Sequence, residues 1–276
     1  MDCKLARFGL FDSPLRYDRE ARAATDQWAA ASKVPEIALA FWVIKIAATT
    51  LGETGGDALS MSMHLGYLLS TVIFMACFIV ALAIQVKAKA FHAYLYWTVI
   101  VTTTTVGTTM ADFADRSLGA GYVGGSLILF ALLLGVLALW RFSVGAISFS
   151  HITSRKVEIF YWTTILFSNT LGTALGDFLA DSGPGYEGGA LVFAAGLTVI
   201  AAAYFFTRIS RTLLFWTAFI LTRPLGATLG DLLTKPHANG GLDLSRISSS
   251  LVIAVFMVIC IRFTSQRAGD HPGART

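Results

Sequence analysis

One pattern occurs four times in this sequence, each time in an apolar stretch. An aromatic residue precedes a Trp, a Gly follows ten residues after the Trp, and an Asp follows five residues after that Gly. The four Trp and Asp pairs are Trp42 and Asp57, Trp97 and Asp112, Trp162 and Asp177, and Trp216 and Asp231. Burial of a carboxylate in an apolar transmembrane helix costs free energy. Its repetition at one register therefore indicates a functional site.

The composition identifies the class of protein. Hydrophobic residues make up 55% of the 276 residues and charged residues 14%, whereas a soluble domain has about 25% charged residues. A helix needs about 20 mostly apolar residues to cross a bilayer. Eight segments are of this kind: 37–56, 65–86, 93–111, 117–140, 159–176, 188–207, 212–233 and 247–261. We therefore predict an all-α integral membrane protein with eight transmembrane helices.

The spacing of the repeats predicts how these helices are connected. The Trp residues are 55, 65 and 54 residues apart, which is the length of one helical hairpin. Two helices per repeat make all four hairpins parallel to one another. We predict a transmembrane domain over residues 35–265, with repeats at 35–88, 89–152, 153–207 and 208–265, between cytosolic tails at 1–34 and 266–276.

Lys and Arg are unevenly distributed between the two sets of loops. The segments before each repeat and after the last carry Lys33, Lys87, Lys89, Arg155, Lys156, Arg208, Arg211, Arg262 and Arg267. The opposite loops carry only Arg116, Lys235 and Arg246. By the positive-inside rule, both termini are predicted to be cytoplasmic. The first 32 residues contain no apolar region typical of a cleaved secretory signal. Together with the eight apolar segments, this leads us to expect a multi-pass protein of the bacterial inner membrane.

Polarity predicts which helices lie inside. The first helix of each repeat carries polar residues, whereas the second carries almost only packing residues. We expect the four Trp-containing helices around a centre and the four plain helices outside, against lipid. Small residues that permit close helix packing occur one turn apart at Gly52 and Gly56, Gly107 and Ala111, Gly172 and Gly176, and Gly226 and Gly230.

Four tandem two-helix repeats, each with a Trp, resemble a family of bacterial membrane proteins that is defined by this repeat and has no known function. The resemblance covers about residues 35–265. It implies the fold and a bacterial origin, and it transfers no binding or catalytic residue.

The candidate site follows from helical periodicity. We number positions from the Trp of each repeat, so that the Asp is at position 15. Residues at positions 7, 11 and 15 lie along one face of a helix. The proposed cation and proton ligands are Asp57, Asp112, Asp177, Asp231 and Glu53. The proposed residues of the substrate pathway are Thr104, Thr108, Asn169, Thr173, Lys45 and Arg223.

Four carboxylates near helix C-termini repel one another and the helix dipole, so protons or cations must neutralise them. This requirement suits a secondary transporter of a small cation that is coupled to protons, with a divalent metal as one candidate substrate. The Thr and Asn oxygens are ligands that hard cations accept. Lys45 and Arg223 are interpreted as internal counter-charges; the alternative is a buried ion pair with a carboxylate of a neighbouring repeat.

Other interpretations remain open. The repeated Gly, Thr and Asp residues also suit a non-transport scaffold or sensor, and the Trp residues suit membrane-interface anchors or packing. Neither an enzyme nor a cofactor is predicted, because no nucleophile set or metal-ligand spacing is evident. The net charge of +4 is not taken as a nucleic-acid signal. We expect Pro224 to kink or break the seventh span. The oligomeric state is not predicted.

Overall fold

The computed structural model describes residues 33, 35–88, 90–119, 121–145, 155–183 and 185–268. Most of the two predicted tails, at 1–32 and 269–276, lies outside the described residues. Eight long helices are present in the described part: α2 (Leu39–Asp57), α3 (Gly66–Lys87), α4 (Ala93–Asp112), α5 (Gly121–Val144), α6 (Arg155–Asp181), α7 (Gly185–Phe206), α8 (Arg211–Thr234) and α9 (Arg246–Phe263). The described residues form no β-sheet.

Three short helical turns complete the described structure. The π-helical turns η1 (Ala58–Ser62) and η2 (Phe113–Ser117) continue α2 and α4 directly, and the 3₁₀ turn η3 (His237–Asn239) lies between α8 and α9. An isolated antiparallel bridge joins Pro35 to Ala268. The protein is thus all-helical, as its apolar segments predict.

The inner helices form a closed ring. Helix α2 packs against α4, α4 against α6, α6 against α8, and α8 against α2. These are the four helices that carry the Trp and Asp residues. The predicted separation of inner from outer helices is therefore observed.

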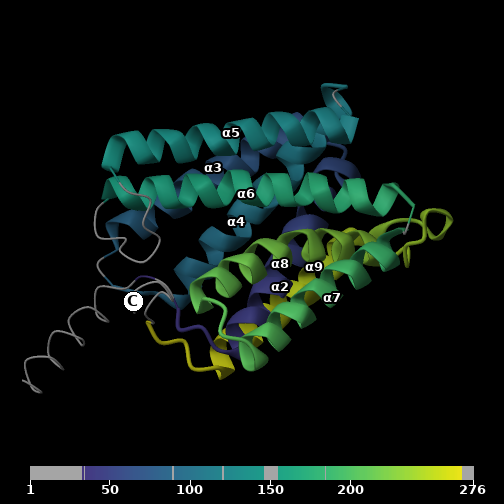
Figure 1. Ribbon diagram of the computed structural model, residues 1–276. Helices are drawn as coiled ribbons and strands as arrows, with labels where there is room; N and C mark the ends of the chain where they lie inside the picture. The colour runs from purple at the N-terminus through teal and green to yellow at the C-terminus, as the bar shows by residue number, and fades with distance from the viewer. Residues whose placement is uncertain are drawn as a thin grey trace, which may run out of the picture.

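Each outer helix covers the repeat that follows its own. Helix α3 packs on α4, α5 on α6 and α7 on α8, and α9 closes the circle by packing on α2. In Figure 1, α5 runs along the upper edge of the bundle and α7 along its lower edge. Each outer helix therefore packs against the inner helix of the next repeat, and these contacts connect neighbouring repeats.

The outer helices present an apolar surface. All four outer helices, α3, α5, α7 and α9, are long and apolar enough to cross a membrane, and so is the inner helix α8. In α7, for example, Leu191, Val199 and Phe205 are exposed. A contiguous apolar surface of this kind marks a membrane contact. The structure thus indicates a multi-pass membrane protein.

The small residues bring the ring helices into contact in a cyclic pattern. A Cβ atom added to Gly52 on α2 would lie 2.3 Å from Oγ1 of Thr104 on α4, and one added to Gly226 on α8 would lie 2.2 Å from Oγ1 of Thr49 on α2. A Cβ on Gly172 would likewise meet Arg223 at 2.8 Å. The residue at position 7 of one repeat therefore packs directly against the Gly at position 10 of the preceding repeat. A side chain at position 10 would collide with it, so Gly is required there.

The Trp residues pack at one end of this ring. Ring centroids are 5.6 Å apart for Phe41 and Trp97, and 5.9 Å apart for Tyr96 and Trp162. Trp97 is only 2% exposed, and its Nε1 donates a hydrogen bond to Oε1 of Gln266 at 3.1 Å. Of the two predicted roles for the Trp residues, packing is the one seen here. We call the layer formed by Phe41, Tyr96, Trp97 and Trp162 the aromatic collar.

Pro224 does not break the seventh span. Helix α8 continues through it from Arg211 to Thr234. Atoms of Pro224 lie close to Gly172 and Gly176 of α6, where an added Cβ would come within 3.4 Å of them. Of the two predicted effects of Pro224, a break is therefore not seen, and a kink stays a prediction.

Candidate functional site

Five positions in each repeat, spaced four residues apart, carry the residues of interest, and a step of four residues is about 6 Å along a helix. Position 3 holds Lys45, Ile100, Ile165 and Phe219; position 7 holds Thr49, Thr104, Asn169 and Arg223; position 11 holds Glu53, Thr108, Thr173 and Ala227; position 15 holds the four Asp residues; and position 19 holds Met61, Arg116, Asp181 and Lys235. The last set was not part of the predicted site.

The predicted carboxylates converge. Oxygens of Glu53, Asp57 and Asp112 lie within 4.8 Å of one another, and so do oxygens of Glu53, Asp177 and Asp231. All five side chains are buried. Because Glu53 belongs to both groups, we treat the five residues as one acid cluster, built from all four inner helices.

Two basic side chains from position 19 bridge the four aspartates. Nζ of Lys235 lies 2.8 Å from Oδ2 of Asp57 and 3.0 Å from Oδ1 of Asp231. Nε of Arg116 lies 3.0 Å from Oδ1 of Asp112, and its Nη2 lies 3.8 Å from Oδ2 of Asp177. Each cation thus binds the Asp four residues earlier in the chain and a second Asp from another repeat.

The charges of the opposite loops are thereby explained. Arg116 and Lys235 are two of the three basic residues that depart from the charge bias of the sequence, and the third, Arg246, has its Nε 3.6 Å from Oδ2 of Asp57. They act as partners of the acid cluster. The available sequence signal was their spacing, since Arg116 and Lys235 each follow an Asp by four residues, as in helical ion pairs.

Lys235 directly follows Thr234, the last residue of α8. Burial alone would lower the pKa of Lys235, but the carboxylates of Asp231 and Asp57 outweigh burial and raise this pKa well above its ordinary value. Lys235 is therefore a permanent positive charge in this arrangement.

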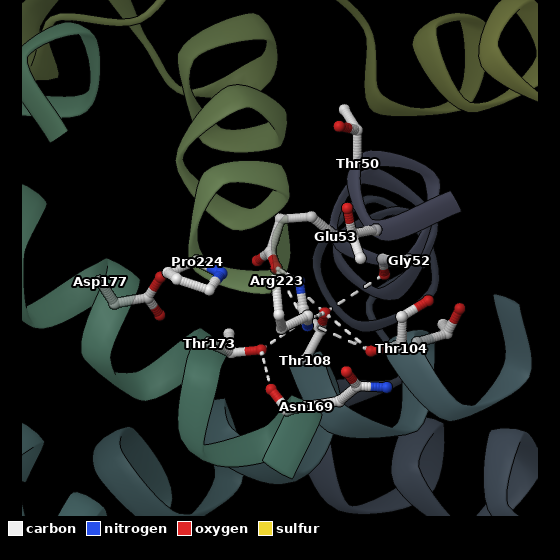
Figure 2. A network of polar contacts seen from close by, with 12 residues as sticks. Thr50, Gly52, Glu53, Thr104, Thr108, Asn169, Thr173, Asp177, Arg223 and Pro224 are labelled. Carbon is white, nitrogen blue, oxygen red and sulfur yellow. Dashed lines mark hydrogen bonds and ion pairs between the residues drawn. The ribbon is translucent and has the colours of Figure 1, made fainter. Parts of the chain in front are cut away.

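A second polar network lies one layer deeper (Figure 2). Nη2 of Arg223 lies 3.3 Å from Oε2 of Glu53 and donates hydrogen bonds to Oγ1 of Thr108 at 2.7 Å and to Oγ1 of Thr173. Thr108 in turn donates to Oε2 of Glu53 at 3.0 Å. Arg223 therefore makes the ion pair with a neighbouring repeat that was one of the two predicted alternatives.

The remaining predicted pathway residues bind elsewhere. Oγ1 of Thr104 donates to the carbonyl oxygen of Ala48 at 3.2 Å, and Nδ2 of Asn169 donates to Oγ1 of Thr103 at 3.3 Å. Both side chains thus bond across helix interfaces of the ring. Their backbone carbonyl oxygens reach the network: that of Thr104 lies 3.4 Å from Nη2 of Arg223, and that of Asn169 accepts a hydrogen bond from Oγ1 of Thr173 at 3.2 Å.

Lys45 has no acidic partner within the described residues. Its Nζ lies 4.1 Å from the centroid of the Phe219 ring, a cation–π contact, and makes no hydrogen bond to the described residues. The side chain is fully buried between the polar layers and the aromatic collar.

A cavity of about 750 Å³ adjoins the position 19 end of the ring. All four position 19 residues line it, together with Arg246, Tyr122 and Tyr186. The hydroxyl of Tyr122 donates a hydrogen bond to Oδ2 of Asp181. The acid cluster does not line this cavity, and the bridging side chains of Arg116 and Lys235 line the cavity while contacting the aspartates.

Comparison with known proteins places the repeats in one family. The model of the Repeat of Unknown Function (DUF347) matches four tandem segments, at residues 40–91, 95–145, 160–210 and 214–267. No curated protein and no solved structure matches the chain. Because the four segments cover most of the chain, and each contains one Trp-bearing inner helix, this protein belongs to the DUF347 repeat family.

Proposed function

We propose that this protein is a secondary transporter that moves a small cation across the bacterial inner membrane in exchange for protons. The eight long helices would all span the bilayer, with both termini in the cytoplasm. The acid cluster would bind either protons or the cation, and the cavity would be its access from the periplasmic side.

The observation that carries the proposal is the acid cluster itself. Five buried carboxylates from four repeats meet at one place. Four cations pair with them, namely Arg116, Arg223, Lys235 and Arg246. The cluster therefore has one carboxylate more than it has paired cations, and the other buried cation, Lys45, contacts the ring of Phe219 instead. A buried charge without a partner is strongly unfavourable, so a proton or a bound cation would stabilise the cluster.

Two carboxylate oxygens are available for such a ligand. Oδ1 of Asp57 and Oδ1 of Asp177 are buried and make no hydrogen bond to any described residue. Carboxylate oxygens are the preferred ligands of hard cations. The opposite end of the ring is filled by the packed aromatic collar, so this arrangement corresponds to access from one side only.

Flux into proteoliposomes tests the proposal. Protein would be reconstituted with a pH gradient, and uptake of K⁺ and Mn²⁺ would be measured. We expect Asp112→Asn and Asp177→Asn to lower the rate by about 10- to 100-fold, as for removal of a group that holds a metal site. Asp181→Asn is the matched control, because Asp181 lies on the same helix as Asp177 and lines the cavity outside the cluster.

The outcomes separate the two functional classes. Flux that is lost in both cluster variants and retained in Asp181→Asn supports transport. Absence of flux with any ion in the unaltered protein, at normal expression and folding, contradicts transport and favours the scaffold or sensor.

A further inference from the structure

Lys235 separates the cavity from two of the aspartates. Its side chain is 7% exposed, and its Nζ is bound between Asp57 and Asp231. The same residue lines the cavity. A cation that enters from the cavity therefore meets the Asp57 and Asp231 pair at a place that an ammonium group already occupies.

The backbone of Lys235 is held firmly. Its N–H donates to the carbonyl oxygen of Asp231 at 2.8 Å, and its carbonyl oxygen accepts from the N–H of Asp243 at 2.9 Å. A Cβ added to Gly241 would lie 2.0 Å from that carbonyl oxygen, so the loop is packed directly against it. Displacement of the ammonium group thus requires only rotation about the flexible four-carbon stem.

Arg116, the second cation that bridges two aspartates, resembles a free metal or ammonium ion less closely than Lys235 does. The guanidinium of Arg116 is planar and spreads its charge over several nitrogens, and its contact with Asp177 is longer, at 3.8 Å. The ammonium of Lys235 is compact and lies at ion-contact distance from both of its carboxylates. A free monovalent ion of similar size would fit between the same two carboxylates.

We propose that Lys235 is a tethered competitor: its ammonium group occupies the substrate site between Asp57 and Asp231, and the substrate is a monovalent cation of similar size, such as K⁺ or NH₄⁺, that displaces it into the cavity. This inference rests on the proposed transport function and names its substrate class. Oδ1 of Asp57, which has no hydrogen-bond partner among the described residues, is available as an additional ligand.

Cation binding to the purified full-length protein tests this inference. The melting temperature in detergent micelles would be measured against KCl and NH₄Cl concentration, with choline chloride keeping the ionic strength constant and MnCl₂ as the divalent probe. Removal of a tethered ligand removes its effective concentration, so Lys235→Met lowers the half-saturating KCl concentration by about tenfold or more.

Two matched variants distinguish competition from loss of charge. Lys235→Arg retains a tethered cation and leaves the half-saturating concentration at or above that of the unaltered protein. Arg246→Met removes a cation from the same cavity that touches only Asp57, at 3.6 Å, and produces a much smaller decrease. Equal half-saturation in Lys235→Met and the unaltered protein overturns the inference, as does a response to MnCl₂ without one to KCl.

A measurement on the unaltered protein covers the case in which Lys235→Met does not fold. Acylation of lysines by an amine-reactive ester would be followed by mass spectrometry with KCl or with choline chloride. KCl accelerates acylation of Lys235 by about threefold or more if the ammonium group is displaced, whereas Lys87, which is exposed, serves as the unchanged reference. An unchanged rate at Lys235 contradicts displacement.

The inference and the proposed function fail in different ways. Ion flux in proteoliposomes without tighter binding by Lys235→Met leaves transport standing and removes the competitor. Tighter binding by Lys235→Met without flux in the unaltered protein leaves a cation site and removes transport.

Discussion

At the scale of single residues, the buried charges are accounted for by short-range pairing. Arg223 and Glu53 are nearly inaccessible to solvent and are tied together through Thr108. A buried ion pair stabilises little by itself, but loss of one partner leaves an uncompensated charge. The sequence predicted that these residues lie in one stripe, because helical periodicity decides which residues share a face. It did not predict that Lys45 contacts Phe219, since that contact depends on the packing of α8 against α2.

We expect Arg223→Met to lower the free energy of unfolding by about 3–5 kcal/mol, because it leaves Glu53 buried without its cation. The double variant Glu53→Met with Arg223→Met is expected to be more stable than Arg223→Met alone. Thermal unfolding in micelles measures both. A double variant less stable than either single variant would contradict this account of the pair.

The burial of Asp115 predicts that the stability of the protein depends on pH. It lies in η2, beyond the end of α4, and neither of its carboxylate oxygens makes a hydrogen bond to the described residues. Burial raises the pKa of Asp115 to about 6, although Arg116 opposes the increase. The pKa of an unfolded Asp is about 3.9. The stabilisation from protonated Asp115 is therefore complete below about pH 4 and is lost as the pH rises through about 6.

Asp115→Asn is expected to remove this pH dependence. The variant melts at a higher temperature than the unaltered protein at pH 8, and the difference shrinks towards pH 4. Melting curves across this range check the expectation. A constant difference between the two proteins at every pH would show that the carboxyl group of Asp115 does not titrate as described.

At the scale of helices, the apolar segments predicted the number of long helices and their approximate bounds. The small residues at positions 10 and 14 predicted close packing, and the structure adds that Gly52 receives Thr104 and Gly226 receives Thr49. The π-helical turns after α2 and α4 and the role of position 19 were not predicted. Arg116 and Lys235 lie beyond the apolar runs, where charge is ordinary, and only their spacing of four residues after an Asp pointed to a partner.

Gly52→Ala tests this packing. We expect it to lower the free energy of unfolding by about 1–3 kcal/mol, because the added Cβ would lie 2.7 Å from Cβ of Thr104 and 3.0 Å from its backbone carbon. Gly55→Ala on the same helix is the control, since the nearest atom to its Cβ is Oγ of Ser250 at 4.0 Å. Equal melting temperatures for the two variants would contradict the interlocked ring.

At the scale of the whole molecule, the four repeats close into a circle. Helix α9 packs on α2, and the N–H of Glu36 donates to the carbonyl oxygen of Arg267 at 2.9 Å. Polarity predicted the inner and outer sets of helices. It did not predict that each outer helix covers the next repeat, because the plain helices carry no specific residue that selects a partner.

A cross-link between Thr54 and Ser250 tests the closure. Their hydroxyl oxygens are 2.9 Å apart across α2 and α9. In a chain without its natural cysteines, Thr54→Cys with Ser250→Cys is expected to form an intramolecular disulfide on mild oxidation. Thr54→Cys with Gly135→Cys is the control, because a side chain added at Gly135 on α5 meets no other residue. Cross-linking only between separate molecules would contradict the circular arrangement.

Release of protons on cation binding tests the central claim most directly. The same buried carboxylates would hold either protons or the cation, and ligands must lose their protons when a cation binds. KCl or MnCl₂ would be added to the purified protein in a weakly buffered solution with a pH indicator, against choline chloride. Release by the unaltered protein and a smaller release by Asp57→Asn with Asp231→Asn is the result we predict. Cation binding without release, or equal release from both proteins, would contradict exchange at the acid cluster.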